Sequence, residues 1–177
     1  MAVTDARGVP IYERSRPDYD ALGIRSGAFL IKPELKLGQE YNDNIYALKN
    51  NTTGDWITTV APKMDVGSDW TRHFLGFSAG LKGGFYASKS DENYMDGHVA
   101  LNGRLDVLRE SFLTASAGFR RLHEERGDPN AQTAWKEPAT YNKTNAALGY
   151  YHGIGKVSVR AGAALDSYDF RSVDLVA

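Results

Sequence analysis

The residues of this chain that could do chemistry are its four histidines and its charged side chains. The histidines stand at positions 73, 98, 123 and 152. A metal site needs at least two ligands on one face of a strand pair at one height. If Val107 pairs with Leu113 across a turn at 108–111, His98 lies opposite Leu122 and His123 points to the other face. The spacing disfavours a metal site, and no metal or cofactor is expected.

Other groupings fail as reactive sites. The GIGK run (153–156) lacks the spacing of a phosphate-binding loop and fits a hairpin tip, with Gly153 at the position that a type II′ turn requires. Carboxylate pairs at 91–92 and 124–125 could bind Ca²⁺, but such pairs are more typical of solvated loops. The chain has no cysteine. No set of serine, histidine and aspartate can be brought together, so an enzyme is not expected.

The strongest pattern runs from Asp55 to Tyr86. Uncharged residues occupy every second position from Trp56 to Trp70, and again from His73 onward, while charged residues and glycines lie between them. Because side chains alternate faces along a strand, this predicts a hairpin with one apolar and one polar face. The two apolar faces coincide if Trp70 lies opposite His73. Each arm has about 14 residues, whereas a tilted strand crosses a bilayer in about 9–11.

The same alternation predicts strands along the rest of the chain. Residues 1–27 lack any period and are expected to form an irregular periplasmic lead-in, and 28–177 to form barrel strands. The further predicted strands run over about 29–46, 97–107, 113–119, 143–150 and 157–165. Long connections at 46–54, 87–93 and 124–140 alternate with short ones at 71–72, 108–111 and 153–154.

Long loops at one end and tight turns at the other are typical of an outer-membrane barrel. No run of about 18 apolar residues predicts a transmembrane helix. Net charge is −1, so nucleic acid is not an expected partner. The predicted fold is all-β, an antiparallel up-and-down transmembrane β-barrel. A soluble two-layer sheet explains the alternation but not strands of this length.

Two sets of side chains would then face defined surroundings. Aromatic residues expected at the membrane interfaces are Tyr41, Trp56 and Phe85 near the long loops, and Trp70 and Tyr150 near the short turns. Mixed charges expected to line the lumen favour ion pairs across strands over strong ion selection. They are Lys32, Glu34, Lys36, Glu40, Lys63, Asp65, Asp69, Arg72, Lys82, Asp96, Arg104, Asp106, Arg120, Lys143, Arg160 and Asp166.

The run RPDYDALG (16–23), followed by YNDN (41–44), resembles the opening of the type 2 β-barrel porins of proteobacterial outer membranes. The later RLHEERGDP (121–129) is similar to the start of a loop in that family. The resemblance implies an outer-membrane pore and, since such genes often accompany exopolysaccharide synthesis, a role in polymer export. Members of that family are much longer, end in an aromatic residue and carry an export signal.

The expected function is a pore in the bacterial outer membrane, with lipid around it and small solutes or a saccharide polymer passing through. Two alternatives stay open: a non-conducting structural or adhesive barrel, and a soluble β-sheet binding module. The opening MAVTDARG shows no export signal. Seven predicted strands cannot close by antiparallel pairing alone, so we expect the N-terminal portion of a larger barrel, forming an open curved meander.

Overall fold

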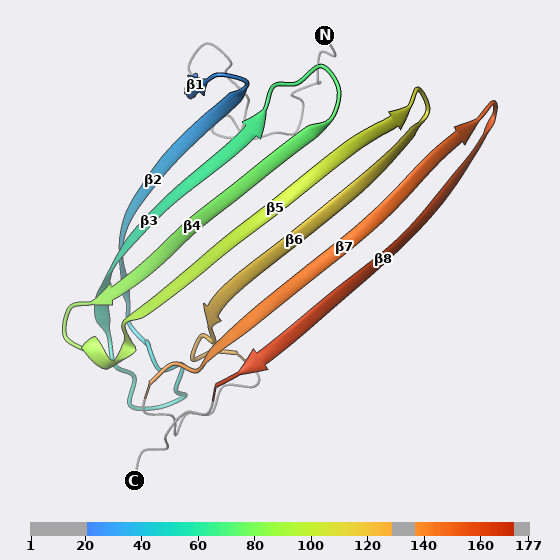
Figure 1. Cartoon of the computed structure of the whole chain (residues 1–177). Helices are drawn as coiled ribbons and strands as arrows, with labels where there is room; N and C mark the ends of the chain where they lie inside the picture. Colours follow the sequence, from blue (N-terminus) through green and yellow to red (C-terminus); the bar gives the residue numbers. More distant parts are fainter. Residues whose placement is uncertain (1–20, 129–136, 172–177) are drawn as a thin grey trace, which may run out of the picture.

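The computed structural model describes residues 21–128 and 137–171, which form one sheet of antiparallel strands in chain order (Figure 1). The described part contains no α-helix, and its one 3₁₀ turn, η2, covers Ser90–Glu92. The strands are β1 (Ile24–Ser26), β2 (Phe29–Asn42), β3 (Asp55–Ser68), β4 (Phe74–Tyr86), β5 (Tyr94–Leu108), β6 (Ser111–His123), β7 (Thr140–Ile154) and β8 (Val157–Phe170).

The seven long strands, β2 to β8, are those that the alternation predicts. The short strand β1, which pairs with the start of β2, falls in the segment expected to be irregular. Strand β2 ends at Asn42, four residues before the predicted end, because the chain turns there. The Asn42 side chain accepts a hydrogen bond from the Asn44 amide, and Asn44 exchanges two hydrogen bonds with the backbone of Leu48. These local hydrogen bonds take the place of the ladder hydrogen bonds that a longer β2 would make with β3.

The hairpin of β3 and β4 has the predicted register. Val66 faces Phe77 and Gly67 faces Gly76, a register that extrapolates to Trp70 opposite His73. The ladder stops earlier than expected, so that the turn spans residues 69–73 instead of two residues. One reason is that the Ser68 hydroxyl accepts the Leu75 amide at 2.9 Å in place of a backbone partner.

The other two short turns differ from the prediction in position but keep the same faces. Leu105, not Val107, faces Leu113, because a bulge lies between Asp106 and Leu108. The last hairpin turns at residues 155–156 and not at 153–154, since Ile154 pairs with Val157. Gly155 has a φ of 60°, the positive value that the first turn residue needs.

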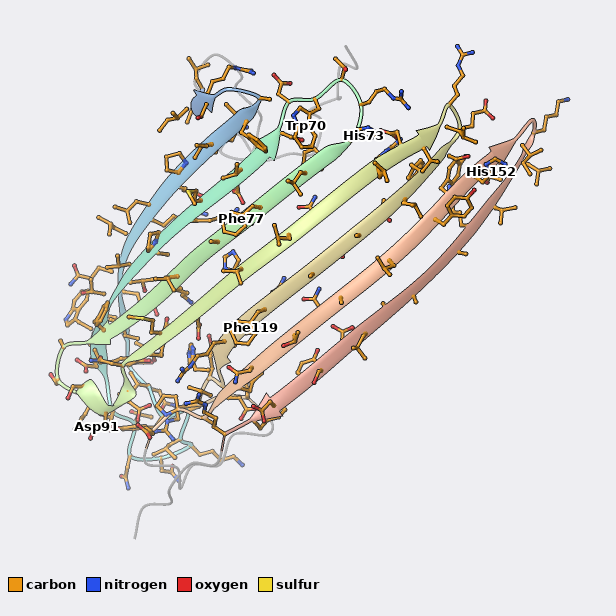
Figure 2. All side chains as sticks on the ribbon, viewed as in Figure 1. Trp70, His73, Phe77, Asp91, Phe119 and His152 are labelled. Atoms are coloured by element: carbon orange, nitrogen blue, oxygen red, sulfur yellow. The ribbon has the colours of Figure 1, made fainter. Side chains whose placement is uncertain are left out.

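The strands present two different faces. The apolar face carries residues such as Leu35, Met64, Phe77 and Leu101, and the polar face carries the residues between them. In the described strands, the apolar face holds only two Asp, Glu, Lys or Arg residues, Arg121 and Asp169, both within the last three residues of a strand at the loop end. Figure 2 shows Phe77 and Phe119 on one broad surface of the sheet.

Among the described residues, no second layer covers the apolar face. Leu37, Leu148 and Leu165 remain 71%, 68% and 68% exposed, and no large side chain in the described residues is fully buried. The buried apolar residues Ile45, Ile57 and Ala139 lie instead at the long-loop end. The sheet therefore has no core of its own along most of its length.

Neighbouring strands are staggered in one direction. One row of paired residues crosses the sheet as Leu30, Gly67, Gly76, Asn102, Ser116, Ala147 and Ala164. Beyond this row, β2 continues for twelve residues to Asn42, but β8 continues for only six to Phe170. At about 3.4 Å per residue and about 4.8 Å between strands, six residues over six strand steps correspond to a tilt of about 35°.

The sheet is open. Its order runs from β1 to β8, and among the described strands β8 pairs only with β7. Strands β2 and β8 also run in the same direction, as an odd number of long strands requires. The predicted open meander is confirmed.

The position of the last turn gives a first prediction. Replacing Gly155 with alanine should destabilise the sheet by about 1–2 kcal/mol, because a Cβ is disfavoured at positive φ. The matched control is Gly38→Ala in β2, where the added Cβ would meet only Thr59 at an ordinary 3.8 Å. Urea unfolding in lipid vesicles measures both changes. Equal stability of the two variants would contradict the turn assignment.

Candidate functional site: the polar face and the long-loop end

The strand register places most of the predicted lumen residues on the polar face. Asp69 and Arg72 lie in the turn at 69–73, where Asp69 pairs with Arg25 and Arg72 donates to the carbonyl of Asp106 at 3.4 Å. The residues on the polar face are Lys32, Glu34, Lys36, Glu40, Lys63, Asp65, Lys82, Asp96, Arg104, Asp106, Arg120, Lys143, Arg160 and Asp166.

Ion pairs on this face run mainly along strands and not across them. Lys63 and Asp65 lie 2.7 Å apart on β3, Lys36 and Glu34 3.1 Å apart on β2, and Arg104 and Asp106 2.8 Å apart on β5. Between neighbouring strands of this face, Lys143 and Asp166 approach to 3.7 Å. Exposed pairs of this kind contribute about 1 kcal/mol or less each. The expected ladder of ion pairs across strands is thus only partly formed.

Three glycines of β4 are covered by side chains of β5. A Cβ at Gly76 would meet Asn102, one at Gly80 would meet the His98 ring, and one at Gly84 would meet the Tyr94 ring. The glycines therefore make room for neighbouring side chains that lie flat on the sheet. They do not leave an empty channel along the strand.

At the loop end, a buried ion pair joins two long connections. Arg126 donates from Nε to one carboxylate oxygen of Glu92 at 2.8 Å and from Nη2 to the other at 2.5 Å. The two side chains are only 8% and 4% exposed. The guanidinium also lies 5.8 Å from the ring centre of Tyr46, in a third loop. Burial raises the pKa of the Tyr46 phenol, and the Glu92 carboxylate acts in the same direction.

A second buried carboxylate fixes the loop at 87–93 to the start of β3. Asp55 accepts the amides of Ser88 and Lys89, each at 2.9 Å, and that of Trp56 at 2.8 Å. The bonds from Ser88 and Lys89 satisfy backbone donors just beyond the end of β4, where the ladder stops. Together with the Glu92–Arg126 pair they make the loop end the most buried part of the described chain.

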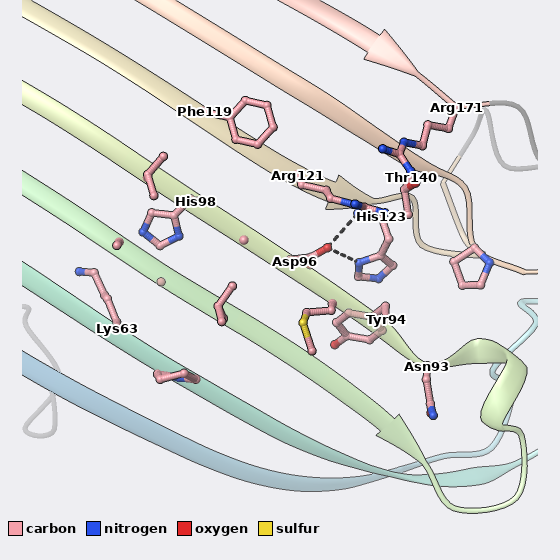
Figure 3. A pocket seen from close by; sticks show the side chains of 18 of the residues that line it. Lys63, Asn93, Tyr94, Asp96, His98, Phe119, Arg121, His123, Thr140 and Arg171 are labelled. Carbon is pink, nitrogen blue, oxygen red and sulfur yellow. Dashed lines mark hydrogen bonds and ion pairs between the residues drawn. The ribbon is translucent and has the colours of Figure 1, made fainter.

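The placement of His123 was not as predicted. Its ring stacks on Tyr94 with centroids 3.8 Å apart, and its Nδ1 lies 2.8 Å from the Asp96 carboxylate, which also accepts the His123 amide (Figure 3). His98 lies opposite Arg120 and not Leu122. The register of β5 against β6 is displaced by two residues from the predicted one, with a bulge between Asp106 and Leu108, and the contact of the His123 ring with Tyr94 and Asp96 is a tertiary contact that alternation does not predict.

One family model matches the chain over residues 16–177, nearly its whole length. Its description is Putative beta-barrel porin 2. The chain belongs to this family. No curated protein and no solved structure matches the chain. In the described residues, no helix is long and apolar enough to cross a membrane.

The described residues contain no grouping of the kind that binds a metal ion, since no three His, Asp or Glu residues among them are grouped so that they could hold one. The side chains that are brought together at the loop end are hydrogen-bonded to each other, as Asp96 is to His123. A family described as a porin suggests a protein without enzymatic activity.

The predicted interface aromatics of the porin lie at opposite ends of the apolar face. At the loop end, Tyr41 faces Trp56 with ring centroids 5.4 Å apart, and Phe85 faces Thr58 on the next row. At the turn end, Trp70 makes an edge contact with Phe29 at 5.6 Å, and Tyr150 faces Leu113. All five predicted residues expose between 40% and 57% of their surface. Their role at a membrane interface stays a prediction.

The buried pair at the loop end gives a second prediction. Arg126→Gln should destabilise the loop end by about 3–5 kcal/mol, because the Glu92 carboxylate would stay buried without its charged partner. Faster cleavage of the 87–93 loop by a protease would report the change, and denaturant unfolding would give its magnitude.

The control for this prediction is Arg25→Gln, which removes an ion pair whose side chains are both 60% exposed. Such a pair contributes about 1 kcal/mol or less, so its loss should leave the loop protected. Equal protease sensitivity of the two variants would show that the buried pair does not hold the loops.

Proposed function

We propose that this porin spans the bacterial outer membrane as part of a β-barrel pore and lets small solutes pass. The observation that carries the proposal is the uncovered, almost uncharged apolar face of a one-layer sheet. In water, a leucine left exposed forgoes about 1.5–3 kcal/mol of burial. The acyl chains of a bilayer would cover this face without any second layer of protein.

The stagger of the strands supports the same conclusion. The apolar face would form a level band only if the strands were tilted by about 35°, which lies within the range of about 35–45° found in membrane barrels. With that tilt, the charged Asp169 comes beside Tyr41 in height, and Arg121 lies about two residues deeper in the band. Both exceptions to the uncharged face then fall in the loop-side part of the band.

The polar face would line the lumen. Its ion pairs stay exposed to 25–73%, as hydrated side chains in a pore would be. At the end of the sheet that carries the long loops, the ion pair of Glu92 and Arg126 holds two of these loops together. These loops would form a structured mouth of the pore. Gly76, Gly80 and Gly84 of β4 are covered by side chains of β5 and so leave no smooth track along which a polymer could slide. We therefore propose passive solute passage and not polymer export.

Planar-bilayer recording of the reconstituted protein tests the proposal. Stepwise conductance increases on addition of the protein are expected. A protein that inserts into the bilayer without conducting would favour the structural or adhesive barrel. A protein that stays in solution without detergent would favour the soluble module.

The assignment of the two faces gives a third prediction. Leu101→Arg should impair assembly far more than Asn102→Arg, although the residues are neighbours on β5. An arginine near mid-bilayer on the lipid side costs about 2–4 kcal/mol, whereas one in the lumen stays hydrated. Val66→Arg and Asp65→Arg form a second matched pair on β3. Membrane insertion into lipid vesicles, followed by protease protection, measures assembly, and equal insertion of all four variants would refute the assignment.

A further inference from the structure

The register gathers positive side chains in one row of the polar face, and the argument built on this row rests on the proposed pore. From β3 to β7 the row reads Lys63, Gly80, His98, Arg120 and Lys143, each paired with the next. Strands β3 to β7 contribute no carboxylate to the row, although in β2 the row continues with Glu34, opposite Lys63. Around Arg120 the fold thus brings together basic side chains that are dispersed among carboxylates in the sequence.

Carboxylates approach the two ends of this row but not Arg120. Asp65 pairs with Lys63 at 2.7 Å and Asp166 approaches Lys143 to 3.7 Å, while Asp96 accepts both the amide and the ring nitrogen of His123. Arg120 itself makes no hydrogen bond or ion pair with any residue of the described ranges. Its direct neighbours on the two adjoining strands are His98 and Lys143. Like charges directly opposite each other on a sheet are destabilising, so the stability of the sheet does not explain this arrangement.

A cavity lies at the same place. It has a volume of about 420 Å³, and its charged lining consists of Lys36, Lys63, Lys82 and Arg120 and the two carboxylates of Glu34 and Asp96, with His98 beside them. Cationic side chains therefore outnumber carboxylates in this lining. The His98 ring covers Gly80, so that a larger residue at position 80 would displace the ring. The cavity would admit a small solute with a charged group.

We propose that Arg120, flanked by His98 and Lys143, forms an oxyanion-binding site in the lumen, and that the pore prefers anions. A guanidinium offers paired N–H donors that fit the two oxygens of a carboxylate or phosphate. Rings of Arg and Lys side chains select anions in pores. The chemical class of solute is one that carries a carboxylate or phosphate group. The mixed charges of the sequence suggested no strong selection, because the sequence alone did not show which charged residues lie opposite one another across the sheet.

The test uses the full protein in a planar bilayer with a KCl gradient. The zero-current potential should show a preference for chloride over potassium, and Arg120→Glu should shift it toward potassium. The control is Arg160→Glu on the polar face, where Arg160 lies over the Tyr151 ring at 5.5 Å, away from the cationic row. This control should shift the potential much less.

Inorganic phosphate gives a second measurement that does not depend on conductance. Phosphate should bind the protein in detergent micelles in a calorimetric titration, and Arg120→Gln should weaken binding at least about tenfold, equivalent to about 1.4 kcal/mol. Arg160→Gln should leave binding unchanged. The far-UV spectrum and the heat-dependent electrophoretic mobility check that each variant is folded.

The outcomes separate this inference from the proposed pore. Conductance without anion preference, or a preference that Arg120→Glu leaves unchanged, would overturn the inference and leave the pore standing. Absence of conductance would overturn the pore, and phosphate binding that depends on Arg120 would then still support the site. Absence of phosphate binding, or binding equal in wild type and Arg120→Gln, would overturn the site in either case.

Discussion

The constraint on which the rest of the structure depends is that its apolar face must be covered, which we propose that lipid does. A sheet of one layer leaves residues such as Leu37, Leu148 and Leu165 uncovered along its length. The backbone hydrogen bonds of the ladder hold the strands together, but they contribute little net free energy in water, where the unfolded chain also forms hydrogen bonds. In lipid the balance changes, since every unpaired backbone group there costs several kcal/mol. The same ladder then becomes obligatory.

The stagger of the strands determines how the apolar residues, the aromatic residues and the basic side chains are arranged on the sheet. Because each strand is displaced relative to the last, the apolar residues form a level band only in a tilted sheet. Tilt brings Tyr41 and Trp56 to one border and Trp70 and Tyr150 to the other. The same register places Arg120 and Lys143 in the ladder row of Lys63, with two strands between Lys63 and Arg120. The apolar band and the cationic row are therefore two consequences of one register.

The loop end is stabilised differently from the strands, by the burial of apolar side chains and of an ion pair. There the chain buries Ile45 and Ile57 and closes around the ion pair of Glu92 and Arg126, as a small globular protein would. A buried pair of this kind is costly to break, because either partner alone would keep its charge without solvent. The loops are consequently more tightly held than their polar sequences suggest. This gives the proposed pore a mouth of fixed shape at one end.

The sequence by itself determined the strands and their faces, because a period of two is a local property that the backbone of a strand imposes on its side chains. From it alone one could place Leu101 and Asn102 on opposite faces and predict the register of β3 and β4. Only the tertiary structure decided heights across the sheet. The bulge after Asp106 and the turn at Gly155 each moved a pairing without changing a face, and alternation cannot detect such a shift. The stacking of His123 on Tyr94 and the pairing of Glu92 with Arg126 also required the structure, since both join residues about thirty positions apart through non-repeating contacts.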